Sequence, residues 1–150
     1  MTNVEVTGSV VPRLSRRDVA AFVRKVLIAL EKLNRLDDEI TDVSVAFVDD
    51  ATMRRLNRKF RRKYRTTDVL TFPADDSYAD PKKSGRPLGD IVISIDRALR
   101  QAVREKHSTA IEVRYLLVHG VLHALGYDHE TDHGEMNQLE IELRAEVGLD

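Results

Sequence analysis

The chain has 150 residues, of which 24 are lysine or arginine and 25 are aspartate or glutamate, and it contains no cysteine. The absence of cysteine excludes disulfide bonds and thiolate metal sites, and no apolar run approaches the roughly 20 residues that cross a bilayer. The first residues lack the basic and then apolar pattern of a signal peptide. We therefore expect a single domain, residues 1–150, in the cytoplasm.

The N-terminal third predicts a strand followed by a helix. Residues 3–11 alternate loosely between apolar and polar side chains, as a strand does. Ser15 and Asp18 are spaced as a variant of the capping box that opens a helix. Apolar residues then recur at helical spacing, and we expect this helix to end near Leu36.

The middle of the chain predicts two strands and a second helix. Residues 42–50 alternate as a strand, and 68–72 form another, which Pro73 stops. Asp50 is expected to cap the helix between them. The apolar spacing predicts three residues on the inner face of that helix: Met53, Leu56 and Phe60.

The second half predicts a long loop at 74–87, a buried strand at 91–93 and three helices. The first two helices are expected at about 95–106 and 109–125, with a capping box of Thr109 and Glu112 at the start of the second. Asp132, with Glu135, is expected to open the third, which ends near Gly148. These elements predict an α/β (α+β) domain with one mixed sheet of about four strands and about five helices.

Three histidines lie within HGVLHALGYDH, residues 119–129. His119 and His123 are four residues apart on a predicted helix and therefore project from one face, so both can bind one metal ion. Gly126 lets the chain leave the helix in a tight turn, which can bring His129 to the same ion. Three imidazoles favour one Zn²⁺ per chain, although nickel, cobalt or copper also accept them. The fourth position would be left for water, as in catalytic zinc sites.

The same spacing is typical of zinc peptidases, in which a glutamate that acts as the base stands where this chain has Gly120. Without a base within hydrogen-bonding reach, peptide hydrolysis is disfavoured, but a peptidase-like zinc hydrolase remains an alternative. Gly120 could instead serve helix packing by admitting a neighbouring strand. A closed structural zinc with Asp128 as fourth ligand is a further alternative, in a chain that assists ribosome assembly without catalysis.

Two aspartates and two further histidines of the chain have ordinary structural interpretations. Asp68 and Asp128 are candidates for orienting an imidazole, although helix capping or a turn hydrogen bond is the favoured interpretation. His107 and His133 are expected to be ordinary surface or partly buried side chains.

A second functional signal is the segment RRLNRKFRRKYR, residues 54–65, which carries eight basic residues and no acidic one. Such a one-signed run indicates a partner that carries phosphates, although charge runs are often only solvated. Phe60 and Tyr64 could stack on bases, but Phe60 is expected in the core. No recognition helix is evident, so single-stranded or irregular RNA is favoured over duplex DNA.

The histidine motif resembles the H-G-x-L-H-x-x-G-Y-D-H signature of the YbeY family of bacterial endoribonucleases, which act in ribosomal RNA maturation. LNRKFR at 56–61, TDVLTFP at 67–73 and LGDIVIS at 88–94 resemble further motifs of that family. Met136 and Glu140 stand where the family has the same residues. Thr66 and Thr71 depart from its usual proline and serine.

The resemblance implies a single α/β domain that acts as a metal-dependent endoribonuclease on single-stranded RNA. It implies maturation of the 16S ribosomal RNA 3′ end and ribosome quality control, with RNA and the small ribosomal subunit as partners and no membrane. The histidines at 119, 123 and 129 would be the zinc ligands and Arg61 the functionally important arginine. We expect three further basic residues to hold the RNA backbone: Arg58, Arg62 and Arg65.

Overall fold

The computed structural model describes residues 1–61, 68–74, 85–128 and 130–149, without the side chain of Arg61. Its elements agree with the predicted ones to within a few residues. In chain order they are β1 (Asn3–Gly8), α1 (Arg16–Lys32), β2 (Asp42–Val48), α2 (Asp50–Arg61), β3 (Val69–Pro73), β4 (Gly89–Ser94), α3 (Ile95–Glu105), α4 (Thr109–Ala124) and α5 (Glu135–Glu146). None of the helices in these ranges has the length and apolar composition needed to cross a bilayer.

The described strands form one sheet in the order β1-β2-β4-β3. β1, β2 and β4 run parallel, whereas β3 at the edge runs antiparallel to β4. The prediction of a mixed four-stranded sheet is therefore confirmed. The parallel pairs are joined through helices, as parallel connections require.

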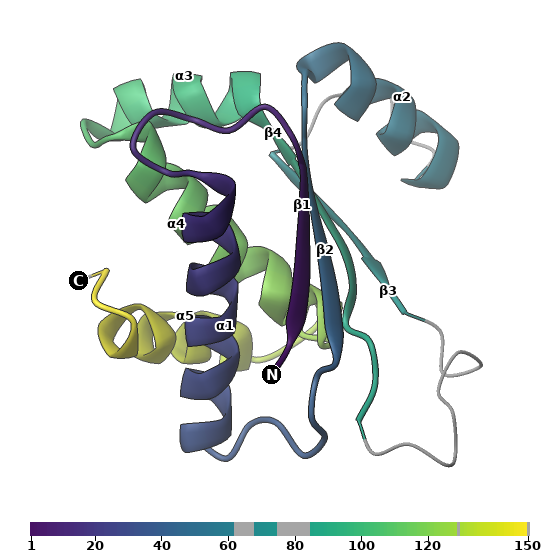
Figure 1. The fold of residues 1–150 in the computed structure, drawn as a ribbon, viewed down its shortest axis with the longest axis vertical. Coiled ribbons are helices and arrows are strands. Elements are labelled where there is room, and N and C mark those ends of the chain that lie inside the picture. The colour runs from purple at the N-terminus through teal and green to yellow at the C-terminus, as the bar shows by residue number, and fades with distance from the viewer. Residues whose placement is uncertain (62–67, 75–84, 129, 150) are drawn as a thin grey trace.

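The two faces of the sheet are covered unequally (Figure 1). Ile91 and Ile93 of β4 point into the main core, which also contains apolar side chains of α1, α4 and α5. Val92 points to the other face, because side chains alternate along a strand. There it joins a small cluster with Met53 of α2 and Leu70 of β3. Helices α4 and α2 thus pack on opposite faces of the sheet.

The helix starts follow the expected chemistry, but two capping residues were predicted one position too late. Ser15 and Asp18 form the predicted capping box. At α2, however, Asp49 Oδ1 accepts the Thr52 N–H and Asp50 is already helical. At α4 the cap is Ser108, whose Oγ accepts the Ile111 N–H. In both cases two adjacent residues suit the role, and the backbone geometry decides between them.

Two helix ends show how local chemistry sets the boundaries. Helix α1 stops at Lys32, four residues before the predicted end, and Asn34 follows with a φ of 57° in the left-handed region. Asparagine tolerates that conformation better than most residues. At the start of α5, Asp132 accepts the backbone N–H groups of Gly134 and Met136, but the N-cap is Gly134, two residues later than predicted.

Asp50 fastens α2 to the end of β4 and the start of α3. Its carboxylate accepts hydrogen bonds from Ser94 Oγ and Arg100 Nη2, both at 2.7 Å. Its backbone N–H donates to Asp96 Oδ2 at 2.8 Å. Burial raises the pKa of Asp50, but the bonds from Ser94 and Arg100 outweigh it and hold the pKa below its usual value. The ionised form is therefore the one that the fold stabilises.

The prediction that Phe60 lies in the core is wrong. Met53 is fully buried and Leu56 half-buried, but Phe60 is 52% exposed and makes an edge contact with Phe72 of β3. Asn57 takes the buried position one turn after Met53, with 2% exposure. In the last turn of α2, the face that packs on the sheet therefore does not include Phe60.

Candidate metal centre

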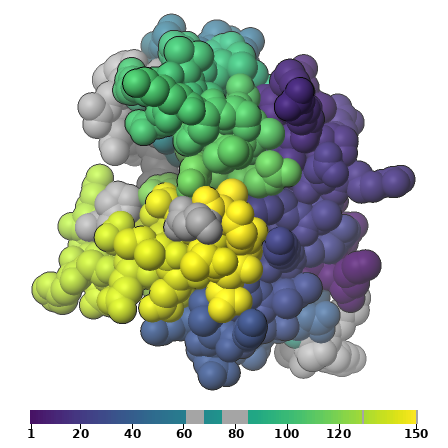
Figure 2. Space-filling view, turned by 90° about the vertical axis from the view of Figure 1, so that its left-hand side faces the viewer, coloured from purple at the N-terminus to yellow at the C-terminus, as the bar shows by residue number. Residues whose placement is uncertain are grey.

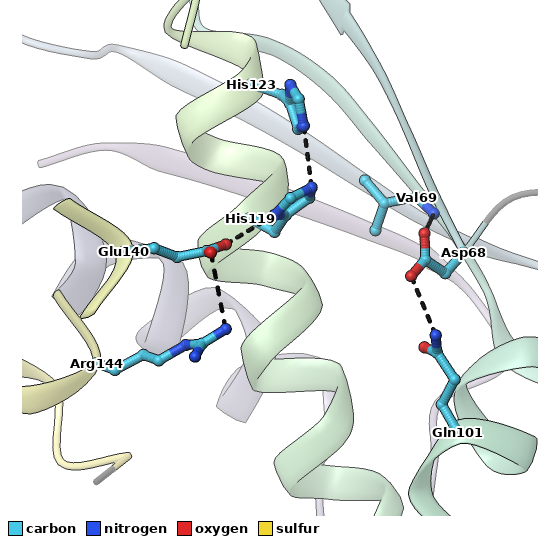
Figure 3. Close-up of polar contacts among 7 residues, drawn as sticks. All are labelled: Asp68, Val69, Gln101, His119, His123, Glu140 and Arg144. Atoms are coloured by element: carbon cyan, nitrogen blue, oxygen red, sulfur yellow. Dashed lines mark hydrogen bonds and ion pairs between the residues drawn. The ribbon is translucent and has the colours of Figure 1, made fainter. Parts of the chain in front are cut away.

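The first two predicted ligands converge on one face of α4 (Figure 3). His123 Nε2 lies 2.9 Å from His119 Nε2, and the two rings are inclined by 72° with their centroids 4.5 Å apart. Both side chains remain partly exposed. The four-residue spacing therefore brings two imidazole nitrogens together at the surface of the main core, as the sequence predicts.

Glu140 of α5 fixes the orientation of His119. The His119 Nδ1–H donates to Glu140 Oε1 at 2.7 Å, since an ionised carboxylate can only accept. Glu140 is 8% exposed, so it is held in place by packing. A neutral His119 with its proton on Nδ1 would keep a lone pair on Nε2, the atom that faces His123.

Arg144 continues this chain of contacts away from the histidines. One turn after Glu140 on α5, its Nη2 lies 3.7 Å from Glu140 Oε2. Its guanidinium also lies over the ring of Tyr115, 4.6 Å from the ring centre. The orienting carboxylate thus has an imidazole on one oxygen and a guanidinium near the other (Figure 3).

The histidine pair fits a zinc ion. Two nitrogen ligands of a tetrahedral zinc, each at about 2.0–2.1 Å, lie about 3.3 Å apart, so the observed 2.9 Å separation needs only a small ring rotation. A carboxylate on the far nitrogen of a ligand histidine is the usual outer contact in zinc proteins. The predicted third ligand, His129, lies outside the described residues. Among those that are described, no three His, Cys, Asp or Glu side chains gather around one point.

Gly120 faces the sheet. A Cβ at this position would lie 2.7 Å from Cγ2 of Ile91 on β4, which is far closer than a carbon–carbon contact allows. The glycine therefore lets α4 approach β4, as the packing interpretation of this residue proposed. A glutamate side chain would have to start from a Cβ directed into this buried contact.

Of the two aspartates considered for orienting an imidazole, Asp68 accepts hydrogen bonds at the start of β3 and from α3, and Asp128 accepts one in a turn. Asp68 accepts the Val69 N–H at 2.9 Å and Gln101 Nε2–H at 3.4 Å (Figure 3). Asp128 accepts the Glu130 N–H at 2.9 Å in a turn. The orienting role of Glu140 was not predicted from the sequence. A signal was present, because Met136, Leu139 and Leu143 form an apolar helical face in which Glu140 is the one acidic member.

The basic segment begins on the other side of the sheet from the histidines. Arg58 is exposed on α2, and α2 packs on the face opposite to α4 (Figure 1). The other three basic site residues fall on undescribed parts: Arg62 and Arg65 lie outside the described residues, as does the side chain of Arg61. The sheet therefore separates Arg58 from the histidine pair, and β3 is the strand at the edge where the two faces meet.

Residues 8–148 match the family model described as endoribonuclease YbeY. Relatives with that same name include proteins from Nautilia profundicola, 45% identical over 80% of this chain and 84% of its own length, and from Solibacter usitatus, 43% identical over 81% and 79%. The chain belongs to the endoribonuclease YbeY family. The resemblance in the sequence motifs is thereby confirmed, and so is the prediction of a hydrolytic endoribonuclease.

A solved structure supports the fold of this YbeY family member independently. The solution structure of a protein from Thermotoga maritima superimposes with a TM-score of 0.57, covering 96% of this chain and 88% of the other. The two chains are 24% identical. At that identity the likeness supports the α/β architecture alone.

Proposed function

We propose that this protein is a zinc-dependent endoribonuclease that cleaves single-stranded RNA during ribosomal RNA maturation, at the 3′ end of 16S RNA, and takes part in ribosome quality control on the small subunit. Membership of the endoribonuclease YbeY family supports the reaction class. The observation that carries the zinc proposal is the convergence of two imidazole nitrogens, one of them oriented by a buried carboxylate.

In this proposal the residues of the chain have distinct roles. His119, His123 and His129 hold the ion, and Glu140 keeps the proton of His119 on Nδ1. Bound zinc would act as a Lewis acid and lower the pKa of a coordinated water to about 7. Arg61 offsets the charge that develops on the phosphoryl oxygens, a role suited to its planar fork of donors. Arg58, Arg62 and Arg65 hold the RNA backbone.

A nucleophile supplied by the RNA would explain the lack of a carboxylate base at position 120. The 2′-hydroxyl next to the scissile phosphate can attack the phosphorus and displace the 5′-oxygen of the following nucleotide. That route leaves a 2′,3′-cyclic phosphate, whereas attack by water leaves ordinary phosphate and hydroxyl ends. Analysis of the product ends therefore separates the two routes.

The main experiment combines metal content with RNA cleavage. Wild-type protein should hold one zinc per chain and cleave single-stranded RNA. His123→Ala should lose both properties, and Arg61→Ala should lose cleavage while keeping the metal. Removal of zinc with a chelator should abolish cleavage, and its return should restore it. Full cleavage by metal-free protein would refute the zinc proposal.

A second experiment tests the role of Glu140. Glu140→Gln removes the carboxylate that holds His119 Nδ1–H, and loss of such an outer contact weakens metal affinity by about 10–100-fold. Glu142→Gln on the same helix is the matched control and should leave the affinity unchanged. Zinc affinity is measured by competition with a chromophoric chelator. Equal affinities for the two variants would exclude an orienting role.

Cleavage can also be separated from the two rival functions. A peptidase-like hydrolase would cleave an unstructured peptide rather than RNA, and the burial of position 120 against Ile91 opposes this. An assembly factor with a purely structural zinc would unfold when His119 is replaced by alanine, and any folded remainder would still bind RNA. Loss of cleavage with folding and binding retained would support catalysis.

A further inference from the structure

A cavity lies beyond the histidine pair, between α3, α4 and α5. It has a volume of about 400 Å³ and is lined by Gln101 and Arg104 of α3, Tyr115 of α4 and Arg144 of α5, among others. Small-molecule sites begin at about 300 Å³, so a nucleotide can be accommodated. In Figure 2, α3 (green) lies above α5 (yellow) on the face that is shown.

Two polar atoms in its walls lack a partner among the described residues. Arg144 Nε and Gln101 Oε1 are both buried without a hydrogen bond. Arg144 is also only loosely paired with Glu140, at 3.7 Å. Unsatisfied buried donors and acceptors are unusual in folded proteins, and each calls for a physical reason. Both atoms are themselves covered, so the cationic side chains that the walls present to a ligand are the exposed Arg104 and Arg144, whose side chain is 31% exposed.

The cavity also has aromatic side chains and little free negative charge. The rings of His107 and Tyr115 are 5.5 Å apart and tilted by 36°, and the Tyr115 hydroxyl donates to the Leu149 carbonyl, which fixes that ring. Glu112 accepts a hydrogen bond from His107 Nε2–H at 2.8 Å, so its carboxylate is engaged. The other carboxylate, Glu105, is exposed at the end of α3, where salt screens it.

The cavity continues the face of α4 that carries the histidines. Glu112, Tyr115, His119 and His123 follow one another at spacings of three and four residues, so they line one stripe of the helix. Tyr115 and His119 are four residues apart, which is about 6 Å along the axis.

We propose that this cavity is a nucleotide subsite for the RNA residue next to the cleaved phosphate. Arg144 and Arg104, on opposite walls, bind the phosphate of that residue. The base of that residue lies against His107 and Tyr115. The inference rests on the proposed function, because it assumes that the strand passes the histidine pair.

The test measures cleavage by zinc-loaded protein on single-stranded RNAs lengthened one nucleotide at a time on each side of the cleavage point. For wild type, kcat/KM should rise about tenfold, equivalent to about 1.4 kcal/mol, at the length that first fills the cavity. Arg104→Gln should lack this step through a higher KM at unchanged kcat. Arg104 is exposed, so the variant should fold normally.

Salt dependence identifies the lost contact as a phosphate contact. The slope of log kcat/KM against log salt should be shallower by about 0.7 in Arg104→Gln, the value for one phosphate of a single strand. Arg17→Gln removes an exposed arginine from α1 and should keep both the step and the slope. Arg144→Gln should lose the step and also change zinc affinity, because Arg144 contacts Glu140.

The outcomes separate this inference from the proposed function. If wild type cleaves RNA and Arg104→Gln and Arg144→Gln keep the length step and the salt slope, the subsite is refuted while the endoribonuclease proposal stands. If wild type cleaves no RNA of any length, both proposals fail. Loss of the step in the two cavity variants alone, with Arg17→Gln unaffected, supports the subsite.

Discussion

The contact between Gly120 and Ile91 allows a quantitative prediction for Gly120→Ala. The added Cβ would lie 2.7 Å from Ile91 Cγ2, about 1 Å inside the 3.5–4.0 Å of a normal carbon contact. Ile91 is fully buried and β-branched, so its side chain cannot rotate away easily. Overpacking costs about 1–3 kcal/mol, and the better helix propensity of alanine returns about 1 kcal/mol. We expect a net loss of about 1 kcal/mol in the free energy of unfolding.

A double-mutant cycle tests the cause of that loss. Ile91→Leu removes the Cγ2 branch at nearly constant volume, so in its background Gly120→Ala should become neutral or stabilising. The expected coupling between the two substitutions is about 1–3 kcal/mol. Urea unfolding of the four metal-free proteins, followed by circular dichroism, gives the four free energies. A coupling near zero, or a wild-type background in which Gly120→Ala is stabilising, would refute the close-approach argument.

Three further predictions concern the helices. Asp50→Asn should lower the free energy of unfolding at neutral pH by about 1 kcal/mol. Because the pKa of Asp50 is lowered in the fold, this difference should be present above pH 3.8 and vanish as the pH falls through the lowered pKa. Urea titrations at several pH values measure it. Ser108→Ala should destabilise the protein by about 1 kcal/mol whereas Thr109→Ala should not, which thermal unfolding can check. Phe60 is 52% exposed, so we expect its ring to stack on a base: Phe60→Ala should weaken single-stranded RNA binding by about 1–3 kcal/mol in a fluorescence anisotropy assay with little loss of stability, and unchanged binding would refute this role.

The sequence predicts local structure well because local structure depends on short spacings. The α4 histidines, the capping box of Ser15 and the alternating strand β2 are all read from neighbours within four residues. Capping was missed by one position at Asp49 and Ser108, because adjacent polar residues have the same capping chemistry and differ only in backbone angles.

The parts that the sequence analysis missed depend on contacts between distant segments. Glu140 meets His119 across 21 residues, and only the packing of α5 on α4 brings them together. The sheet separates Arg58 from the histidines because α2 packs on the face opposite to α4. The apolar spacing within α2 does not specify which face of the sheet the helix covers. Phe60 satisfies the helical period but lies beyond the small cluster under α2.

The unequal cover of the two sheet faces has a consequence for local unfolding. Helix α4 belongs to the large core, whereas α2 rests on the buried trio Met53, Leu70 and Val92 and on the bonds of Asp50. Segments with few buried apolar contacts open at lower free energy than the rest of a domain. Amide hydrogens of α2 should therefore exchange with solvent well before those of α4, so the basic helix can detach and re-dock while the histidine helix stays folded.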